Sequence, residues 1–296
     1  MEVRIRPLDP ERDGADLARL WRAALEPWPL LPGGLALLRT GLVAEVGGRS
    51  VAALGYDGAG SIQLLLVDPA VRRRGVGTRL VGEASERLRA LGAAEVSLGS
   101  GGSDYVWPGI PTNLPGAGPF FAGQGWEIAE ELVADLICDL RRYTRPASAP
   151  PAPSTATLEV ARGSAVQEAI DFEDRCFPEW AHYFRGDRGS ILIARDQQGA
   201  IVGSLLFDGP GAGSVFEPML GADMATIGCV GVAESARRSG VRSEMVVRAS
   251  EMLRDAHAGN CHIGWAWDPP FYERLGYTRW REYREARRRL EPVPAS

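Results

Sequence analysis

The strand-to-helix turn VDPAVRRRGVGTRL, at residues 67–80, contains the residues best suited to bind an anion. The first N–H groups of a helix have no partner within the helix, and the helix dipole adds partial positive charge at the same end. Gly75 and Gly77 remove the Cβ atoms that would keep a phosphate away from this backbone. Three consecutive side chains add positive charge around it: Arg72, Arg73 and Arg74. The turn is therefore predicted to bind a pyrophosphate.

Taken alone, this turn is also compatible with an ordinary strand-to-helix connection. It has neither the G-x-G-x-x-G of dinucleotide sites nor the G-K-[ST] of nucleotide-binding loops. A second turn of the same type, AESARRSGVR, occurs at residues 233–242. Each turn is followed at a similar distance by a related aromatic segment, PFFAGQGW at 119–126 and PFYERLGY at 270–277. This internal repeat favours a shared function for the two turns.

The paired turns and aromatic segments resemble the GNAT superfamily of N-acetyltransferases, and the resemblance covers almost all of both halves. In that family an R/Q-x-x-G-x-G/A loop binds the pyrophosphate of acetyl-CoA. The first half matches completely at Arg72, Gly75 and Gly77, which implies a cofactor loop that also includes Val76 and Thr78. The second half matches at two positions and has a large side chain at the third: Arg237, Gly240 and Arg242. The first half is therefore expected to bind acetyl-CoA, and Arg242 is expected to crowd the second loop.

The resemblance also implies roles for the aromatic segments and for the strand before each turn. The family segment F-Y-x-x-x-G-[FWY] forms a wall near the thioester, and its tyrosine often protonates the departing thiolate. Tyr272 matches that tyrosine, whereas Phe121 stands in its place in the first half and has no hydroxyl. Backbone N–H groups of the preceding strand are expected to polarise the thioester carbonyl. The strand residues concerned are Leu66, Val67, Val230 and Val232.

Transfer to an amine also requires a group or a water that accepts the amine's proton. Glu45, in GLVAEVGG, is one possible base, although a solvated hairpin residue would fit the same pattern. Residues 99–118 form a Gly/Pro-rich loop that either shapes substrate access or is a disordered insertion. Asp104 and Tyr105 of this loop are predicted to reach the site. Tyr105 either replaces the hydroxyl that Phe121 lacks or only packs there.

The elements that position these residues also repeat, and each half is predicted to be β-α-ββ-β-α-β-α-β. Residues 144–156, TRPASAPPAPSTA, are too rich in proline for a helix or a ladder and are expected to be an extended linker. The prediction is two tandem α+β domains, 1–143 and 157–296. By resemblance, each has a mixed, mostly antiparallel, splayed sheet flanked by helices. The strand within 127–140 is expected to close the sheet of the first half, and 277–290 is expected to be the last, polar strand region of the second.

The composition of the chain argues against three classes of function: nucleic-acid binding, metal binding and membrane association. The chain has 296 residues, a net charge of −5 and 33 basic residues, all of them arginines interspersed with acids, which argues against nucleic-acid binding. Its four cysteines form no C-x-x-C pair and its three histidines have no ligand spacing, so no metal site is expected. No apolar run approaches the ~20 residues of a membrane span, and the N-terminal segment is charged. No membrane association and a cytoplasmic location are expected.

These observations predict an acetyl-CoA-dependent N-acetyltransferase that acts on a primary amine of a small molecule or peptide, as a monomer or homodimer. The favoured arrangement is that one half catalyses while the other braces it or forms the acceptor cleft, with the first half binding acetyl-CoA. The alternative is an acyl-CoA-binding sensor or scaffold with little turnover, because each half lacks one part of the family's equipment.

Overall fold

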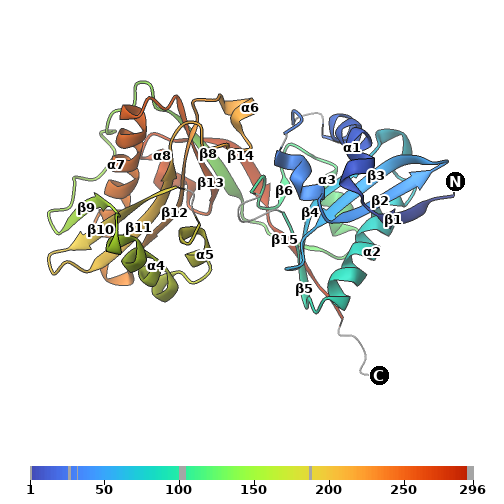
Figure 1. Ribbon diagram of the computed structural model, residues 1–296, viewed down its shortest axis with the longest axis horizontal. Helices are drawn as coiled ribbons and strands as arrows, with labels where there is room; N and C mark the ends of the chain where they lie inside the picture. The colour runs from blue at the N-terminus through green and yellow to red at the C-terminus, as the bar shows by residue number, and fades with distance from the viewer. Residues whose placement is uncertain (1, 26–27, 32, 100–104, 187–188, 292–296) are drawn as a thin grey trace. The chain divides into compact units, whose positions relative to one another are not determined.

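The computed structural model describes residues 2–25, 28–31, 33–99, 105–186 and 189–291 (Figure 1). The chain divides into two compact units, each described here by itself. The first unit comprises residues 1–133 together with 282–296, and the second comprises residues 134–281. Asp104, which the sequence places near the site, lies outside the described residues.

The first unit contains a sheet in the strand order β1-β2-β3-β4-β5-β15-β7. Strands β4 and β5 are parallel, and the other neighbouring strands are antiparallel. Its elements are β1 (Arg4–Pro7), α1 (Pro10–Ala24), the 3-10 helix η1 (Gly33–Leu38), β2 (Gly41–Val46), β3 (Arg49–Tyr56), β4 (Ser61–Val67), the 3-10 helix η2 (Pro69–Val71), α2 (Val76–Ala90), β5 (Glu95–Leu98), β6 (Ile110–Pro111), α3 (Ala117–Ala122), β7 (Glu127–Ile128) and β15 (Ala286–Arg289).

Helices α1 and α2 cover opposite faces of this sheet (Figure 1). Strands β2 and β3 are buried along most of their length, as their nearly continuous apolar sequences require. Leu42 and Leu54 pack in one cluster with Leu80 of α2. Val43 and Ala53 alternate with them, are also fully buried, and face the side that α1 covers. The sheet is thus the middle layer of the unit.

The second unit repeats this architecture with the strand order β14-β8-β13-β12-β11-β10-β9. Its β12 and β13 are the parallel pair. Its elements are β8 (Val133–Asp139), β9 (Ala156–Val160), α4 (Ser164–Cys176), α5 (Ala181–Phe184), β10 (Ser190–Asp196), β11 (Ile201–Asp208), α6 (Glu217–Leu220), β12 (Ala225–Val232), the 3-10 helix η4 (Glu234–Ala236), α7 (Val241–Asp255), β13 (Asn260–Ala266), α8 (Pro269–Glu273) and β14 (Thr278–Arg284).

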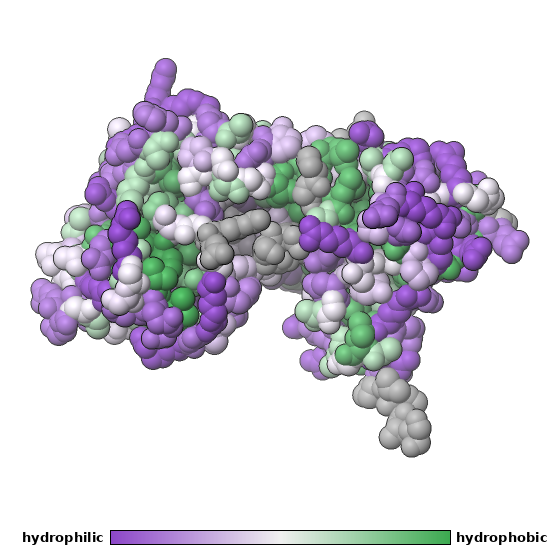
Figure 2. Space-filling model, in the orientation of Figure 1, coloured by the Kyte–Doolittle hydropathy of each residue, from purple (hydrophilic) through white to green (hydrophobic). Residues whose placement is uncertain are grey.

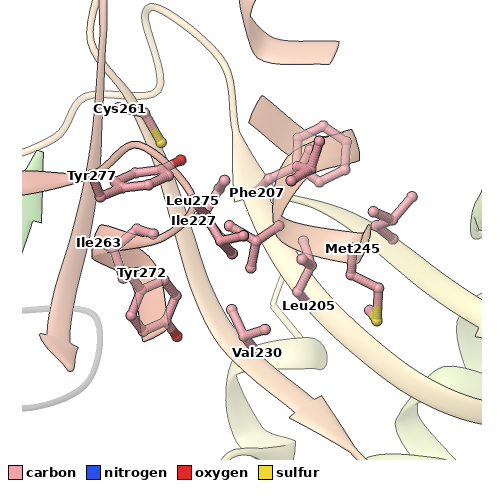
Figure 3. Packing of buried hydrophobic residues seen from close by; sticks show 14 of the residues in the cluster. Leu205, Phe207, Ile227, Val230, Met245, Cys261, Ile263, Tyr272, Leu275 and Tyr277 are labelled. Carbon is pink, nitrogen blue, oxygen red and sulfur yellow. The ribbon is translucent and has the colours of Figure 1, made fainter. Parts of the chain in front are cut away.

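Strand β10 shows how both faces of the second sheet are buried. Leu192 belongs to the large cluster that includes Met245 of α7. Ile191 and Ile193 belong to a separate cluster on the other face, together with Ala169 of α4. Figure 3 shows part of the large cluster, in which Met245 lies near Leu205 and Phe207 of β11. The two units therefore have the same three-layer construction.

The expectation that the strand within 127–140 closes the sheet of the first half is wrong. Strand β8 follows the first half of the chain but pairs with β13, with Cys138 opposite Cys261. Strand β15, at the C-terminal end, lies between β5 and β7 of the first unit, with Arg288 opposite Val96. The reason is that alternation of apolar residues predicts a strand but not its partner, which long-range packing decides. The units consequently do not follow the division at 144–156.

The fold class is as predicted, α+β with mixed and mostly antiparallel sheets. The splay is visible in the registers, because β4 pairs with β5 only at Ser61 and Ile62. Figure 2 shows polar side chains over most of the visible face. No helix in the described ranges is long and apolar enough to cross a membrane. The described residues also contain no group of three or more His, Cys, Asp or Glu arranged to hold a metal ion.

Candidate active site

A cavity of about 1070 Å³ lies within the first unit. One end is formed by the turn between β4 and α2, and the other by the splay between β4 and β5 with the segment 107–115. Its walls comprise residues of β4, α2, α3 and the end of α1. Of the predicted residues, the cavity is lined by Val67, Arg72, Arg73, Gly75, Val76, Gly77, Thr78 and Phe121. The sequence-predicted turn and the aromatic segment thus meet at one site.

The turn presents unpaired N–H groups to the cavity. Gly75 caps α2 in the left-handed conformation, at φ 78°, and its missing side chain leaves the helix N–H groups without a side-chain cap. The Arg79 N–H makes the first bond along the helix, to the Gly75 oxygen at 3.0 Å. The preceding N–H groups, those of Val76, Gly77 and Thr78, come before that bond, and no acidic residue lies in this first turn. This helix end is therefore suited to an anion.

The aromatic wall lies close to Gly77. A Cβ atom on Gly77 would lie 3.1 Å from Cζ of Phe120 and 3.5 Å from Cγ2 of Val67. A larger side chain at this position would therefore have to enter the cavity or displace the Phe120 ring. Phe120 itself packs edge-on against Phe121, with ring centroids 4.9 Å apart. The small Gly77 beside the large rings of Phe120 and Phe121 thus leaves open space next to the turn.

The three arginines of the turn differ in position. Arg72 donates to two backbone oxygens at 3.1 Å, that of Val67 at the end of β4 and that of Ala24 at the end of α1. Arg73 lines the cavity and has a φ of 62°. Arg74 is exposed and is not among the lining residues. Two of the three predicted side chains thus contribute positive charge to the cavity.

The other end of the cavity is built around a bulge in β4. The register between β3 and β4 shifts at Gly55 and Tyr56, and this shift leaves Gln63 as an extra residue between Ile62 and Leu64. The Trp107 indole donates to the Gln63 backbone oxygen at 2.9 Å, which satisfies an oxygen at the point where β5 diverges. Gln63, Leu65 and Val67 share one face of β4 and line the cavity. Leu66 points to the opposite face and is fully buried there.

Two residues of the first unit that the sequence proposes for catalysis do not line this cavity. Glu45 lies on β2 and accepts from Arg6 at 2.8 Å and from Arg12 at 3.0 Å, so its carboxylate is part of an ion-pair cluster rather than of the site. Tyr105 is half-buried and is likewise not among the lining residues. Sequence reasoning gave no role to Trp107 or Phe120, and did not choose Gln63, although alternation along β4 places it on the same face as Val67.

The second unit keeps the turn but fills the space beside it. Gly240 is again left-handed, at φ 88°, and Arg238 has the φ of 62° that Arg73 has in the first unit. Arg242 stands in the place of Gly77, and its guanidinium lies 3.9 Å from the Phe271 ring centroid. It also donates to the Tyr272 hydroxyl at 3.3 Å. The aromatic wall of the second unit, Phe271 and Tyr272, thus packs against the side chain of Arg242.

Tyr272 is buried in the core of the second unit, close to Val230 and Ile263 (Figure 3). Burial raises the pKa of its hydroxyl, and the neighbouring charge of Arg242 opposes this rise. Arg242 also faces Asp268, 3.7 Å away. The predicted strand residues Val230 and Val232 are both buried in the same core. The hydroxyl that resemblance assigns as an acid is therefore engaged by an arginine.

The segment that contains the predicted linker packs on this second turn. Arg145 forms an ion pair with Glu244, in the first turn of α7. The Pro151 oxygen lies 3.6 Å from the position of a Cβ atom on Gly240, beside the turn that begins at Arg237. The helix end that would attract a phosphate is therefore already matched with an acidic side chain and covered by chain. The two turns have the same backbone conformation, but they differ in the charge at the helix end and in the space open beside it.

Comparison with known proteins agrees with this geometry. Residues 15–103 match the sequence profile described as "Acetyltransferase (GNAT) family". The first half of the chain thus contains a match to the GNAT family. No curated protein sequence matches the chain.

Solved GNAT structures resemble the whole chain. A glucosamine N-acetyltransferase region of a fungal multi-domain GH3 β-N-acetylglucosaminidase is 26% identical, with a TM-score of 0.87 over 97% of this chain and 38% of that protein. The chain thus spans about two fifths of the length of that relative. A GCN5-related N-acetyltransferase from Sphaerobacter thermophilus (18% identity, TM-score 0.70, 98% and 96% of the two chains) shares the fold. So does a tandem GNAT protein from the clavulanic acid biosynthesis pathway (21%, 0.66, 99% and 100%).

Proposed function

We propose that this protein is an acetyl-CoA-dependent N-acetyltransferase whose donor binds in the cavity of the first unit. The observation that supports this most is the combination at the turn, where three N–H groups and two arginines border a cavity kept open by Gly77. The residues fit the donor chemically. The pyrophosphate would lie at the α2 N-terminus, and the pantetheine would follow the face of β4 formed by Val67 and Leu65.

The reaction is direct transfer from a thioester to an amine. The amine nitrogen forms a bond to the acyl carbon, the carbon–sulfur bond breaks, and the CoA thiolate takes up a proton that the amine releases. Backbone N–H groups of β4 near Leu65 and Val67 are suited to polarise the carbonyl, because β5 diverges from β4 there. Water is the proposed carrier of the proton. Glu45 has no part in this step, because its carboxylate is held in ion pairs with Arg6 and Arg12.

The proposed acceptor is a primary amine of a small molecule or peptide. The glucosamine named for the fungal relative makes an amino sugar the first acceptor to test. The second unit is proposed to brace the first without binding a donor, because Arg242 and the segment around Pro151 take the corresponding space.

Calorimetry with acetyl-CoA on the full chain tests this assignment. We expect one site per chain. Gly77→Arg, which places in the first unit the side chain found in the second, should abolish detectable binding. The reciprocal variant Arg242→Gly should retain the first site with unchanged affinity, and circular dichroism should show both variants folded. Binding that survives Gly77→Arg, or two donor sites in the unmodified chain, would contradict the proposal.

The second candidate is an acyl-CoA-binding sensor with little turnover. It is favoured by one observation, that Phe121 lacks a hydroxyl while the hydroxyl of Tyr272 is held by Arg242. Release of free CoA thiol, measured with a panel of amino sugars, amino acids and peptides, separates the two functions. Stoichiometric binding without thiol release from any acceptor would favour the sensor.

A further inference from the structure

The edge of β4 that faces the cavity has backbone groups without a strand partner. Strand β5 pairs with the first two residues of β4 and then diverges. Alternate residues of an antiparallel strand bond to the same neighbour, and the Asp68 N–H donates to the Val51 oxygen of β3 at 2.9 Å. The N–H and C=O groups of Leu65 and Val67 therefore point away from β3, toward the splay. Such groups need other partners, because an unpaired backbone group is costly where water is excluded.

Arg72 supplies the partner of the Val67 oxygen. Its Nε donates to this oxygen at 3.1 Å, and its Nη2 donates to the oxygen of Ala24, also at 3.1 Å. Ala24 is the last residue of α1, where the carbonyl groups have no partner within the helix. One guanidinium group thus joins the end of β4 to the end of α1, which lie 48 positions apart in the sequence.

A second contact ties the same turn to α1. Asp68 caps the 3-10 helix η2 by accepting the Ala70 N–H at 3.0 Å, and its other oxygen forms an ion pair with Arg19 of α1 at 3.1 Å. Asp68 and Arg72 thus stand on either side of η2, and both reach α1. In the second unit Ala233 takes the place of Asp68, and no side chain caps η4. Anchoring by a capping carboxylate is therefore specific to the turn that borders the cavity.

Arg72 and Arg73 differ in what a move toward a phosphate would cost. If the Arg72 guanidinium turned to an anion, the oxygens of Val67 and Ala24 would both lose their partners. Arg73 lines the same cavity, and its exposed side chain has no hydrogen bond to give up within the described part of the chain. Arg73 and the N–H groups of the helix end are therefore better placed to bind the anion.

We propose that Arg72 is a positioning residue, which holds the phosphate-binding turn and the Val67 carbonyl against α1 and acts on acetyl-CoA through this position rather than as a phosphate ligand. This inference rests on the proposed function and assigns a residue to the donor site. Val67 and Ala24 both line the cavity, so loss of the two bonds would loosen two of its walls. The positive charge that attracts the phosphates then comes from the α2 N-terminus and Arg73.

Calorimetry with acetyl-CoA on the full chain separates position from charge. The Nε2 atom of a glutamine lies as many bonds from the backbone as the Nε atom of an arginine, so Arg72→Gln can keep the bond to Val67 without the charge. Arg72→Met loses both bonds. We expect Kd to rise about tenfold in Arg72→Met and less than about threefold in Arg72→Gln. Circular dichroism should show both variants folded at the temperature of the titration.

The matched control is Arg79→Met. Arg79 lies on α2 near the same turn, and its Nη2 also donates to a backbone oxygen, that of Val3 at 3.2 Å. The control thus removes one charge and one exposed bond without touching α1, and Kd should stay within about twofold of the unmodified value. Between about 50 and 300 mM NaCl, the affinity of Arg72→Met should depend on salt as that of Arg79→Met does.

Three results would overturn the role of Arg72. The first is an unchanged Kd in Arg72→Met. The second is an Arg72→Gln variant that binds as weakly as Arg72→Met. The third is a salt dependence in Arg72→Met that is smaller than in Arg79→Met, because this would identify Arg72 as a phosphate ligand. Absence of acetyl-CoA binding to the unmodified chain would instead refute the proposed function.

Discussion

At the scale of single residues, Glu173 of α4 has a carboxyl group with no exposed surface. Ser204 donates to one of its oxygens. Burial raises the pKa of this carboxyl to about 7, the Ser204 bond lowers it, and the charge of Glu179 raises it further. The folded protein therefore binds this proton more tightly than the unfolded chain does. Stability from this group is present at low pH and is lost as the pH rises from about 4.5 to about 7.

Glu173→Gln should remove this dependence, since the amide stays neutral and keeps an oxygen for Ser204. We expect the variant to be more stable than the unmodified chain at pH 8, by up to ~3 kcal/mol, and nearly equal to it at pH 4.5. Urea unfolding at the two pH values measures the difference. The exposed Glu234→Gln serves as the control and should show no such gain. A loss of stability at pH 8 in Glu173→Gln would show that the carboxylate is bound favourably in the folded state.

At the scale of one helix, the N-cap glycine of α2 and a glycine in its interior should respond to alanine in opposite ways. Gly75 is left-handed at φ 78°, so Gly75→Ala should destabilise the protein by about 1 kcal/mol and weaken acetyl-CoA binding. Gly82 lies inside the same helix, and a Cβ atom there would meet nothing within 4 Å. Gly82→Ala should therefore stabilise by about 0.5–1 kcal/mol and leave binding unchanged. Thermal unfolding and calorimetry check both, and a stabilising Gly75→Ala would contradict the capping role.

These elements also show why part of the site could be predicted from sequence. The turn at Gly75 and Gly77 was predictable because a cap and the following helix lie within a few residues, and because the chain repeats it at Gly240. The position of Glu45, in contrast, could not be predicted from local sequence. Its pairing with Arg6 depends on how β1 lies beside β2, a contact between residues 39 positions apart.

The sequence predicts the strands of both sheets, but it does not predict the partners of β8 and β15. The sequence of β8 is buried on both faces, which indicates an inner strand but not which sheet contains it. In β15, Arg288 lies 5.2 Å from the Trp126 ring and donates to Ser85. These contacts join residues more than 150 positions apart, and no local pattern encodes them. Long-range packing therefore decides which half each closing strand joins.

At the scale of the whole molecule, the first unit is formed by two separate stretches of chain, and neither unit matches one half of a chain divided at 144–156. A cut within 144–156 would leave β8 on the N-terminal fragment, although β8 pairs with β13 of the C-terminal fragment. The same cut would leave β15 on the C-terminal fragment, although β15 pairs with β5 and β7 of the N-terminal one. Each fragment would thus supply a strand to the sheet of the other.

A protease site placed at residues 152–155 should therefore nick the chain without separating it. We expect the two fragments to elute together in size-exclusion chromatography, to keep acetyl-CoA binding, and to separate only in denaturant. The N-terminal fragment 1–143 expressed alone should be unstable, because β5 would lack β15. A chain that joins 1–133 to 282–291 through a flexible linker supplies that strand and should recover a cooperative unfolding transition. Free separation of the nicked fragments in native buffer would contradict the strand exchange. Each fragment supplies a strand to the sheet that the other fragment mainly forms, so the fragments cannot separate while both sheets remain folded.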